Sequence, residues 1–308
     1  MSLMGYSSLQ IKSLKTLRIN KNMTVKYKQR EPKKLNPSDK NFYLDNGYLV
    51  VKKLFTHSEC DEILGRLTSY KNSKGAAMMN MDREYELSRY SQEKIAEERG
   101  ISFDSVPLED IPFDRIVKDC QLFREFMRDQ RFVSFLEQLH QGEYEVMAGR
   151  DHFEWGGLMT QIIFKDQKTQ YANQAWNPHQ DNSYVRNPNG LYVTTNTFFE
   201  NADMGNGTMF IYPGTHKEGI LPCKEVKSFR ESEGENPGNI SVIPLKYERV
   251  DLEFEKGDIL FLNGNVVHGS YPNKSLCRNR PLYMNVYIPR GEFFMPGRGS
   301  RKMFIPLD

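Results

Sequence analysis

The residues Asn177-Pro178-His179-Gln180-Asp181 are the stretch around which the rest of this chain is organised. Successive side chains on a β-strand point to opposite faces, so residues two positions apart share a face. On a strand, His179 and Asp181 would therefore present an imidazole nitrogen and a carboxylate oxygen to the same metal ion. A second histidine, His268, follows much later in the chain.

Two histidines and one carboxylate are the ligand set of a facial site for non-haem Fe(II), in which the opposite face of the metal stays open to reactants. A His-x-Asp sequence alone is a weak signal, because it also occurs by chance and then forms a polar pair in a turn. The sequence on either side of the motif is therefore needed to distinguish a metal site from a polar pair in a turn.

The composition indicates a globular chain without a surface for nucleic acid. The 308 residues can bury a sizeable core, in one large domain or two small ones. Lys+Arg 42 and Asp+Glu 40 nearly balance, which argues against nucleic-acid binding. No apolar run approaches the roughly 18 residues of a membrane span. Four scattered cysteines, no C-x-x-C pair and no secretory signal predict reduced thiols and a cytoplasmic location.

The N-terminal part predicts helices around one early strand. Residues 1–35 are rich in lysine and serine and are predicted to be a flexible basic leader, with residues 36–308 as a single domain. A capped helix from Asn36 to Asn46-Gly47 precedes a strand at Tyr48–Val51 and a second helix behind a capping box. Residues 71–114 form either a lid over a pocket or a solvated surface insertion, with a helix around residues 83–99.

Helical stretches and then strands follow. Residues 115–140 form two amphipathic segments broken near Asp129. After Gly142 the apolar runs are short, mostly rich in β-branched and aromatic residues, and separated by turns. The predicted strands are Tyr144–Ala148, Leu158–Phe164, Tyr192–Phe199, Thr208–Tyr212, Asp258–Leu262 and Leu282–Ile288. Helices followed by such strands predict an all-β jelly roll, a double-stranded β-helix barrel with N-terminal helices as support.

Further polar patches occur in a definite order around the motif. They are Gln161 and Lys165, the segment Asn206–Lys217, the segment Lys256–Phe261, His268-Gly269-Ser270 and Arg280. Together with Asn46–Val51 near the start, this order resembles the phytanoyl-CoA dioxygenase family of Fe(II)- and 2-oxoglutarate-dependent oxygenases. The resemblance extends from Phe42 to Ile288.

The resemblance implies that His179, Asp181 and His268 hold Fe(II), with 2-oxoglutarate and O2 as co-substrates. It also implies hydroxylation of a substrate C–H bond with release of succinate and CO2. In related halogenases a small residue replaces the acidic ligand, so the presence of Asp181 favours hydroxylation over halogenation.

A basic residue has to bind the distal carboxylate of 2-oxoglutarate, and a guanidinium can do so through two hydrogen bonds. The family usually places this residue eleven positions after the second histidine, whereas Arg280 lies twelve and Arg278 ten positions after His268. We assign the role to Arg280, which stands at the entry to the last clear strand, and a supporting hydroxyl to Ser270. Arg278 is then a solvated surface charge.

Other polar residues have both a functional and a structural interpretation. Gln161, which shares a strand face with Lys165, and Thr208 are candidates for contacts with 2-oxoglutarate, although roles in the sheet suit them equally. Four histidines are assigned no metal ligation, namely His57, His140, His152 and His216. The residues that flank the motif either line the substrate entrance or belong to the core, namely Trp176, Asn182, Tyr184 and Arg186.

The sequence thus predicts a hydroxylase for a small-molecule substrate. One alternative is a small-ligand- or metal-binding jelly roll without oxygenase activity, and another is a redox-inactive zinc site built from the same three residues. Substrate specificity is expected in the loops over residues 71–114, 166–175 and 229–239, because loops vary while the fold stays constant.

Overall fold

The computed structural model describes residues 34–74, 78–80, 94–102, 105, 126, 129–140, 155–167, 170–173, 175–191, 193–226, 238–289, 292 and 305–306. Almost all of the predicted leader, most of the 71–114 segment and the predicted strand Tyr144–Ala148 lie outside these residues, so what was expected of them stays a prediction. Residues 94–99 are helical, which agrees with the end of the helix predicted there.

The first helix, α1 (Pro37–Asn46), has the ends that its sequence predicts. The side chain of the N-cap residue Asn36 accepts a hydrogen bond of 2.7 Å from the backbone N–H of Asp39. The helix ends at Gly47, whose φ of 78° is unfavourable for residues with a side chain. A Cβ at Gly47 would also collide with the ring of His216, so both conformation and space require glycine there.

The two longer helices of the described residues also follow prediction. α2 (His57–Lys74) begins with the expected capping box, in which the Glu59 carboxylate accepts from the Thr56 backbone N–H at 2.7 Å. α6 (Gln130–His140) begins just after Asp129, where the break between two helical stretches was expected.

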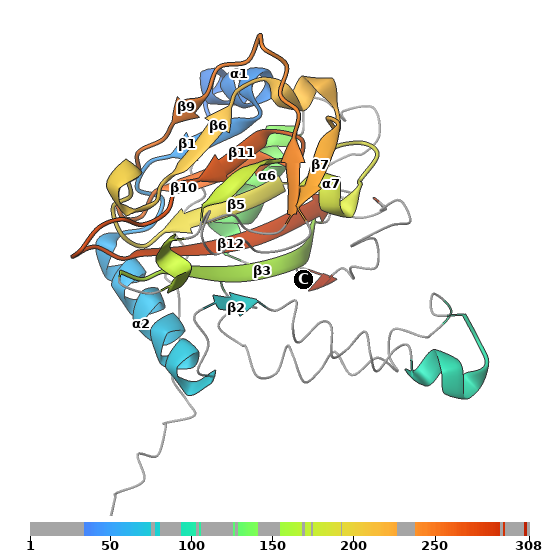
Figure 1. Ribbon diagram of the computed structural model, residues 1–308, viewed down its shortest axis with the longest axis horizontal. Helices are drawn as coiled ribbons and strands as arrows, with labels where there is room; N and C mark the ends of the chain where they lie inside the picture. The colour runs from blue at the N-terminus through green and yellow to red at the C-terminus, as the bar shows by residue number, and fades with distance from the viewer. Residues whose placement is uncertain are drawn as a thin grey trace, which may run out of the picture. The chain divides into compact units, whose positions relative to one another are not determined.

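The strands form two larger antiparallel sheets and one hairpin (Figure 1). The seven-stranded sheet has the order β1-β10-β5-β12-β3, and β2 and β13 both pair with β3. The four-stranded sheet has the order β4-β11-β6-β9, and β7 pairs with β8. The strands are β1 (Tyr48–Val51), β2 (Met78–Asn80), β3 (Trp155–Lys165), β4 (Trp176–His179), β5 (Val193–Phe198), β6 (Met209–Tyr212), β7 (Cys223–Val226), β8 (Gly238–Ser241), β9 (Val250–Asp251), β10 (Ile259–Asn263), β11 (Val267–Ser270), β12 (Arg280–Pro289) and β13 (Ile305–Pro306).

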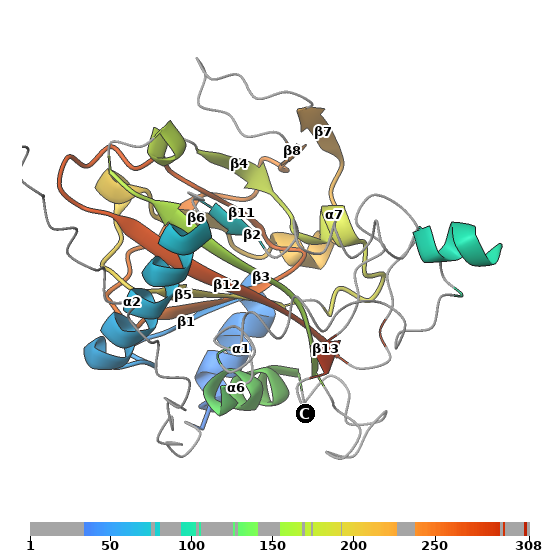
Figure 2. The same cartoon turned by 90° about the horizontal axis from the view of Figure 1, so that it is seen from below.

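The two larger sheets share a buried apolar layer. Leu260 and Leu282 of the seven-stranded sheet belong to one core cluster with Met209 and Ile211 of the four-stranded sheet. On the other side of the seven-stranded sheet, Phe135 of α6 stacks on Phe261 of β10 with ring centroids 5.5 Å apart. Figure 2 shows α6 on one side of this sheet and β4 and β11 on the other. The seven-stranded sheet is therefore covered on both faces.

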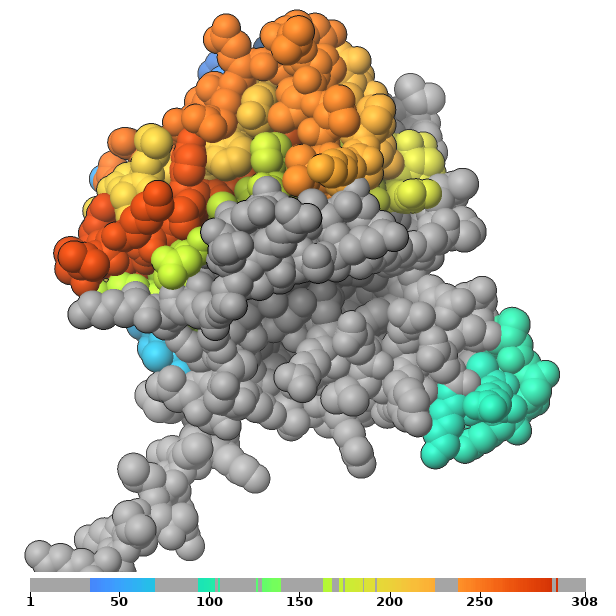
Figure 3. All heavy atoms as spheres, viewed as in Figure 1, coloured from blue at the N-terminus to red at the C-terminus, as the bar shows by residue number. Residues whose placement is uncertain are grey.

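The predicted fold class is confirmed, with differences in detail. Five predicted strands are found with shifts of a few residues at their ends. The described strands form two facing sheets rather than a closed barrel. The short strands β2, β7, β8, β9, β11 and β13 were not predicted, because two to four residues carry little pattern. In the space-filling view, residues of the second half of the chain, in yellow to red, form the surface over the four-stranded sheet (Figure 3).

None of the described helices combines the length and apolar composition that crossing a bilayer would require.

Candidate metal centre

His179 and His268 lie opposite each other in the four-stranded sheet. β4 and β11 are antiparallel neighbours whose register pairs the two histidines directly, and their ring centroids are 4.5 Å apart. Gly269 follows His268, and a Cβ there would come within 2.5 Å of the carbonyl oxygen of Trp176 on β4. The close approach of the two strands therefore requires glycine between His268 and Ser270.

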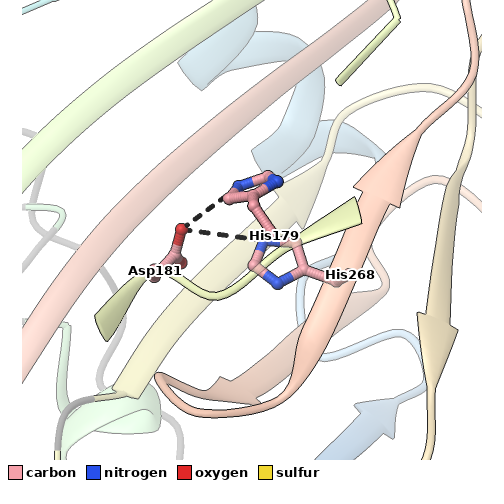
Figure 4. Close-up of side chains that lie close together, drawn as sticks. All are labelled: His179, Asp181 and His268. Atoms are coloured by element: carbon pink, nitrogen blue, oxygen red, sulfur yellow. Dashed lines mark ion pairs between the residues drawn. The ribbon is translucent and has the colours of Figure 1, made fainter. Parts of the chain in front are cut away.

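Asp181 reaches the histidines from a turn and not from the strand. β4 ends at His179, and Asp181 has helical backbone angles (φ −58°, ψ −37°) just before the short helix α7 (Asn182–Val185). The prediction that both motif residues lie on one strand is therefore wrong, because the chain leaves the strand after His179. The turn still directs the carboxylate back toward the sheet. Asp181 Oδ1 lies 3.5 Å from His179 Nε2 and 3.7 Å from His268 Nε2 (Figure 4).

Both imidazoles are oriented to present Nε2 to this cluster. His179 Nδ1 lies 2.6 Å from the carbonyl oxygen of Asn177, and His268 Nδ1 lies 3.2 Å from that of Val266. A carbonyl oxygen only accepts hydrogen bonds, so each Nδ1 carries a proton, and Nε2 is the nitrogen of each ring that is left to face a metal. This is the tautomer that a metal ligand needs when its other nitrogen is held by the protein.

The protonation states of the cluster also suit a metal. Burial lowers the pKa of His268 to about 4, so this ring is neutral near pH 7. Burial alone would raise the pKa of the Asp181 carboxyl, but His268, His179 and the Thr194 hydroxyl outweigh it, and the pKa lies below its usual range. One ligand atom from each of His179, Asp181 and His268 lies within 4.8 Å of the others. Two imidazoles and one carboxylate thus converge in a buried place.

Gln180, the middle residue of the motif, anchors the turn between the two ligands. Its side chain is fully buried. Its amide nitrogen donates to the carbonyl oxygens of Gly219, at 2.7 Å, and of Asn265. Its amide oxygen accepts from the backbone N–H of Leu221 at 2.7 Å. The turn is thereby tied to two other loops, and sequence reasoning assigned no role to this residue.

The turn over residues 264–266 connects the motif with the distant histidine. The backbone N–H of Asn182 donates to the carbonyl oxygen of Gly264 at 2.8 Å, and its side chain donates to Asn265 Oδ1 at 2.7 Å. The next residue, Val266, supplies the carbonyl that holds the ring of His268. The turn over residues 264–266 therefore contacts both the segment that follows Asp181 and the ring of His268. Asn182 has this structural role instead of lining an entrance.

Two buried basic residues lie at neighbouring ends of β3 and β12. The antiparallel register pairs Lys165 with Arg280, and their exposed fractions are 0% and 1%. Lys165 Nζ donates to Ser270 Oγ at 2.8 Å and to the carbonyl oxygen of Tyr271. Burial and then the charge of Arg280 lower the pKa of Lys165 well below its ordinary value. A carboxylate bound here would stabilise both cations.

Arg278 lies outside this buried group. It is partly exposed and forms an ion pair with Asp203, with Arg278 Nη2 2.8 Å from Asp203 Oδ1. Arg280, in contrast, is the first residue of β12 and is buried next to Lys165. Arg278 thus lies at the surface, as expected, and Arg280 is the buried one of the two, while its role in binding a carboxylate stays a prediction.

The remaining cofactor candidates stay predictions. Gln161 lies on β3 opposite Met284, but its side chain is outside the described residues. The hydroxyl of Thr208 donates to the carbonyl oxygen of Leu252 at 2.7 Å, which gives this side chain a structural role.

Of the histidines that were assigned no metal ligation, His216 has a structural contact, since its Nε2 lies 3.0 Å from the carbonyl oxygen of Leu44. His152 lies outside the described residues.

Two of the residues that flank the motif contact the cluster. The rings of Trp176 and Tyr184 have centroids 6.0 and 6.1 Å from that of His179. The hydroxyl of Tyr184 accepts from the backbone N–H of Asn239 on β8 at 2.8 Å. Arg186 is exposed in a left-handed conformation (φ 53°) at the end of α7. Trp176 and Tyr184 thus form part of the wall around His179.

The chain is similar to known proteins over most of its length. A profile of the phytanoyl-CoA dioxygenase family matches residues 43–281. A phytanoyl-CoA dioxygenase of Arabidopsis thaliana is 22% identical over 272 residues, which are 81% of this chain and 87% of that protein. The peroxisomal phytanoyl-CoA dioxygenase of Mus musculus is 26% identical over 245 residues, 78% of this chain and 65% of that protein. The chain thus spans just under two thirds of the mouse relative.

Solved structures with the same fold include the non-haem α-ketoglutarate-dependent carbocyclase SnoK from nogalamycin biosynthesis. Its TM-score is 0.56 at 14% identity, over 86% of this chain and 90% of that chain. The epimerase SnoN, in complex with Fe3+, α-ketoglutarate and nogalamycin RO, gives a TM-score of 0.54 at 16% identity, over 84% of this chain and 85% of that chain. At these identities the likeness concerns the fold, and it supports the jelly-roll class.

Proposed function

Because the chain belongs to the phytanoyl-CoA dioxygenase family, we propose that it is an Fe(II)- and 2-oxoglutarate-dependent oxygenase that hydroxylates a C–H bond of a small molecule. The observation that carries the proposal is the convergence of His179, Asp181 and His268 in a buried place. Two distant segments of the chain supply these ligands, and the hydrogen bonds described above orient both imidazoles for metal binding.

The donor set fits divalent iron. Two imidazole nitrogens and one carboxylate oxygen occupy one side of a metal and leave the other side to co-substrates. His179 Nε2, His268 Nε2 and Asp181 Oδ1 would be the ligand atoms. Zinc accepts the same donors, so the choice of metal has to be part of the test.

The buried basic pair fits a dicarboxylate co-substrate. His268 and Ser270 lie two positions apart on β11, and Ser270 accepts a hydrogen bond from Lys165. The side chains of one strand thus connect the metal ligands with Lys165 and Arg280. One carboxylate of 2-oxoglutarate would bind near the metal and the distal one between the two cations. Gln161 and Thr208 remain candidates for further contacts.

When bound, iron and 2-oxoglutarate supply the oxidising chemistry, in which O2 and 2-oxoglutarate give succinate, CO2 and one oxygen atom for the substrate C–H bond. The residues of the chain hold and orient these groups. Asp181 stays ionised because its pKa is lowered, and His268 stays neutral near pH 7, so neither proton competes with the metal. The rings of Trp176 and Tyr184 pack near the ring of His179.

The substrate is proposed only as a class. The names of the plant and mouse relatives refer to phytanoyl-CoA, and one structural neighbour binds a nogalamycin compound. We propose a small molecule for this chain without extending either name to it. The cytoplasmic location is part of the same proposal, and microscopy of the tagged chain would distinguish it from the peroxisome named for the mouse relative.

Uncoupled turnover tests the proposed function without knowledge of the substrate. Purified protein is supplied with Fe(II), 2-oxoglutarate and O2, and succinate is measured. We expect succinate formation that requires both iron and 2-oxoglutarate and that disappears in His179→Ala and Asp181→Ala. Retention of zinc in competition with Fe(II) under anaerobic conditions would instead favour a redox-inactive zinc site. An absence of both 2-oxoglutarate binding and turnover would favour a binding protein without oxygenase activity.

A further inference from the structure

The two oxygens of the Asp181 carboxylate have different partners. Oδ1 faces the Nε2 atoms of both histidines, at 3.5 and 3.7 Å. Oδ2 accepts a hydrogen bond of 2.8 Å from the hydroxyl of Thr194. The protein therefore already distinguishes the oxygen that faces the cluster from the one that faces β5.

Thr194 is held in place by the sheet. It lies on β5, between β10 and β12, where its neighbours are Leu262 and Val286. Its exposed fraction is 1%. Threonine is branched at Cβ, so its χ1 angle is restricted. A hydroxyl on a central strand therefore gives the carboxylate a rigid partner, although Asp181 itself lies in a turn.

We propose that Thr194 is a positioning residue that keeps Asp181 a metal ligand through one oxygen only. This inference rests on the proposed function, because it assumes that the triad binds a metal. The terminal torsion of an aspartate is broad, so a carboxylate without the Thr194 hydroxyl could rotate or bind through both oxygens. The hydrogen bond to Oδ2 opposes both changes and leaves the remaining positions of the metal to co-substrates.

A purely structural role for Thr194 makes a different prediction. Valine has nearly the same shape as threonine and would fill the same place between Leu262 and Val286, so packing alone would tolerate the exchange. Only the hydroxyl can hold Oδ2. The two roles are therefore separated by variants that change either the hydroxyl or the shape.

The test uses Co(II) as the probe, because its visible absorption spectrum reports the number and arrangement of its ligands. Co(II) is titrated under anaerobic conditions into the wild type, Thr194→Val and Thr194→Ser. Thr194→Ala is a second variant without the hydroxyl, in case valine disturbs folding. The control is Thr197→Val, since Thr197 is on the opposite face of β5, is fully buried and has no hydrogen-bond partner for its hydroxyl among the described residues. Melting curves of the metal-free proteins accompany the titrations.

We expect Thr194→Val and Thr194→Ala to bind Co(II) about 10- to 100-fold more weakly and with an altered spectrum. Thr194→Ser, which keeps the hydroxyl, should stay within a few-fold of the wild type, and Thr197→Val should be unchanged. Wild-type affinity and spectrum in Thr194→Val would overturn the inference, and so would a serine variant as weak as the valine variant. If the wild type itself binds no Co(II), the metal centre and the proposed function fail with it.

Discussion

The two faces of the seven-stranded sheet use buried side chains in different ways. On β12, Arg280 belongs to the basic pair near the candidate metal centre, whereas Tyr283 and Tyr287 on the other face contact aromatic rings of the helical side. Phe126 packs edge-on against Tyr283, with centroids 4.6 Å apart, and Phe132 lies 6.3 Å from Tyr287. Besides its apolar layer, the face toward the four-stranded sheet buries charges that a ligand could stabilise, whereas the helical face buries aromatic rings that stabilise one another. Activity and folding stability should therefore be separable by face.

The largest effect is expected from His268→Ala. This exchange removes one of three ligands while leaving the packing of the helical face intact. We expect no detectable Fe(II) binding in an anaerobic titration and no uncoupled succinate formation, together with a metal-free melting temperature within a few degrees of the wild type. Retained turnover would show that His268 is not a ligand.

Phe132→Ala should have the opposite profile. Phe132 is fully buried against Phe55 and Phe126, with centroids 5.6 and 5.2 Å away. Truncation of such a ring costs about 3–5 kcal/mol of unfolding free energy, which denaturant titration would measure. The affinity of the folded variant for Fe(II) should stay at the wild-type value. A variant that loses metal affinity at full stability would contradict the division between the faces.

Arg280→Ala and Arg278→Ala form a matched pair for the co-substrate. Removal of one partner of a buried charged contact costs about 2–5 kcal/mol, so the KM for 2-oxoglutarate should rise about 30-fold or more in Arg280→Ala. Arg278 is exposed and paired with Asp203, so Arg278→Ala should leave this KM within about two-fold of the wild type. Uncoupled succinate formation at varied 2-oxoglutarate supplies both values. The reverse order would reassign the distal carboxylate to Arg278.

The smallest effect is expected for His216, which belongs neither to the candidate metal centre nor to the basic pair of Lys165 and Arg280. Burial lowers the pKa of His216 below the ordinary value, so the unfolded chain takes up this proton more readily than the folded one. Stability should therefore decrease as the pH falls through about 6.5, the usual histidine pKa. We expect a weaker pH dependence in His216→Gln than in the wild type when unfolding free energies are compared between pH 7.5 and 5.5. An equal pH dependence would mean that His216 does not contribute.

Much of the candidate site was predictable because residue type and order already limit its chemistry. His179, Asp181 and His268 converge as predicted, and the buried strand position of Arg280 distinguishes it from Arg278. The helix caps at Asn36 and Gly47 depend on local interactions, and so they were predicted well.

The features that were missed depend on tertiary contacts. Asp181 was placed on a strand, yet β4 ends two residues earlier because Gln180 is bound to Gly219, Leu221 and Asn265 in other loops. Such contacts leave no periodic pattern in the sequence. Thr194 could not be recognised either, because alternation along β5 shows which residues share a face but not which face meets Asp181.

The most direct test of the central claim is a crystal structure of the protein grown anaerobically with Fe(II) and 2-oxoglutarate. We expect one iron, located by its anomalous scattering, bound by His179 Nε2, His268 Nε2 and Asp181 Oδ1. We also expect the distal carboxylate of 2-oxoglutarate against Lys165 and Arg280. Iron at another place, or a 2-oxoglutarate held at Arg278, would contradict the central claim.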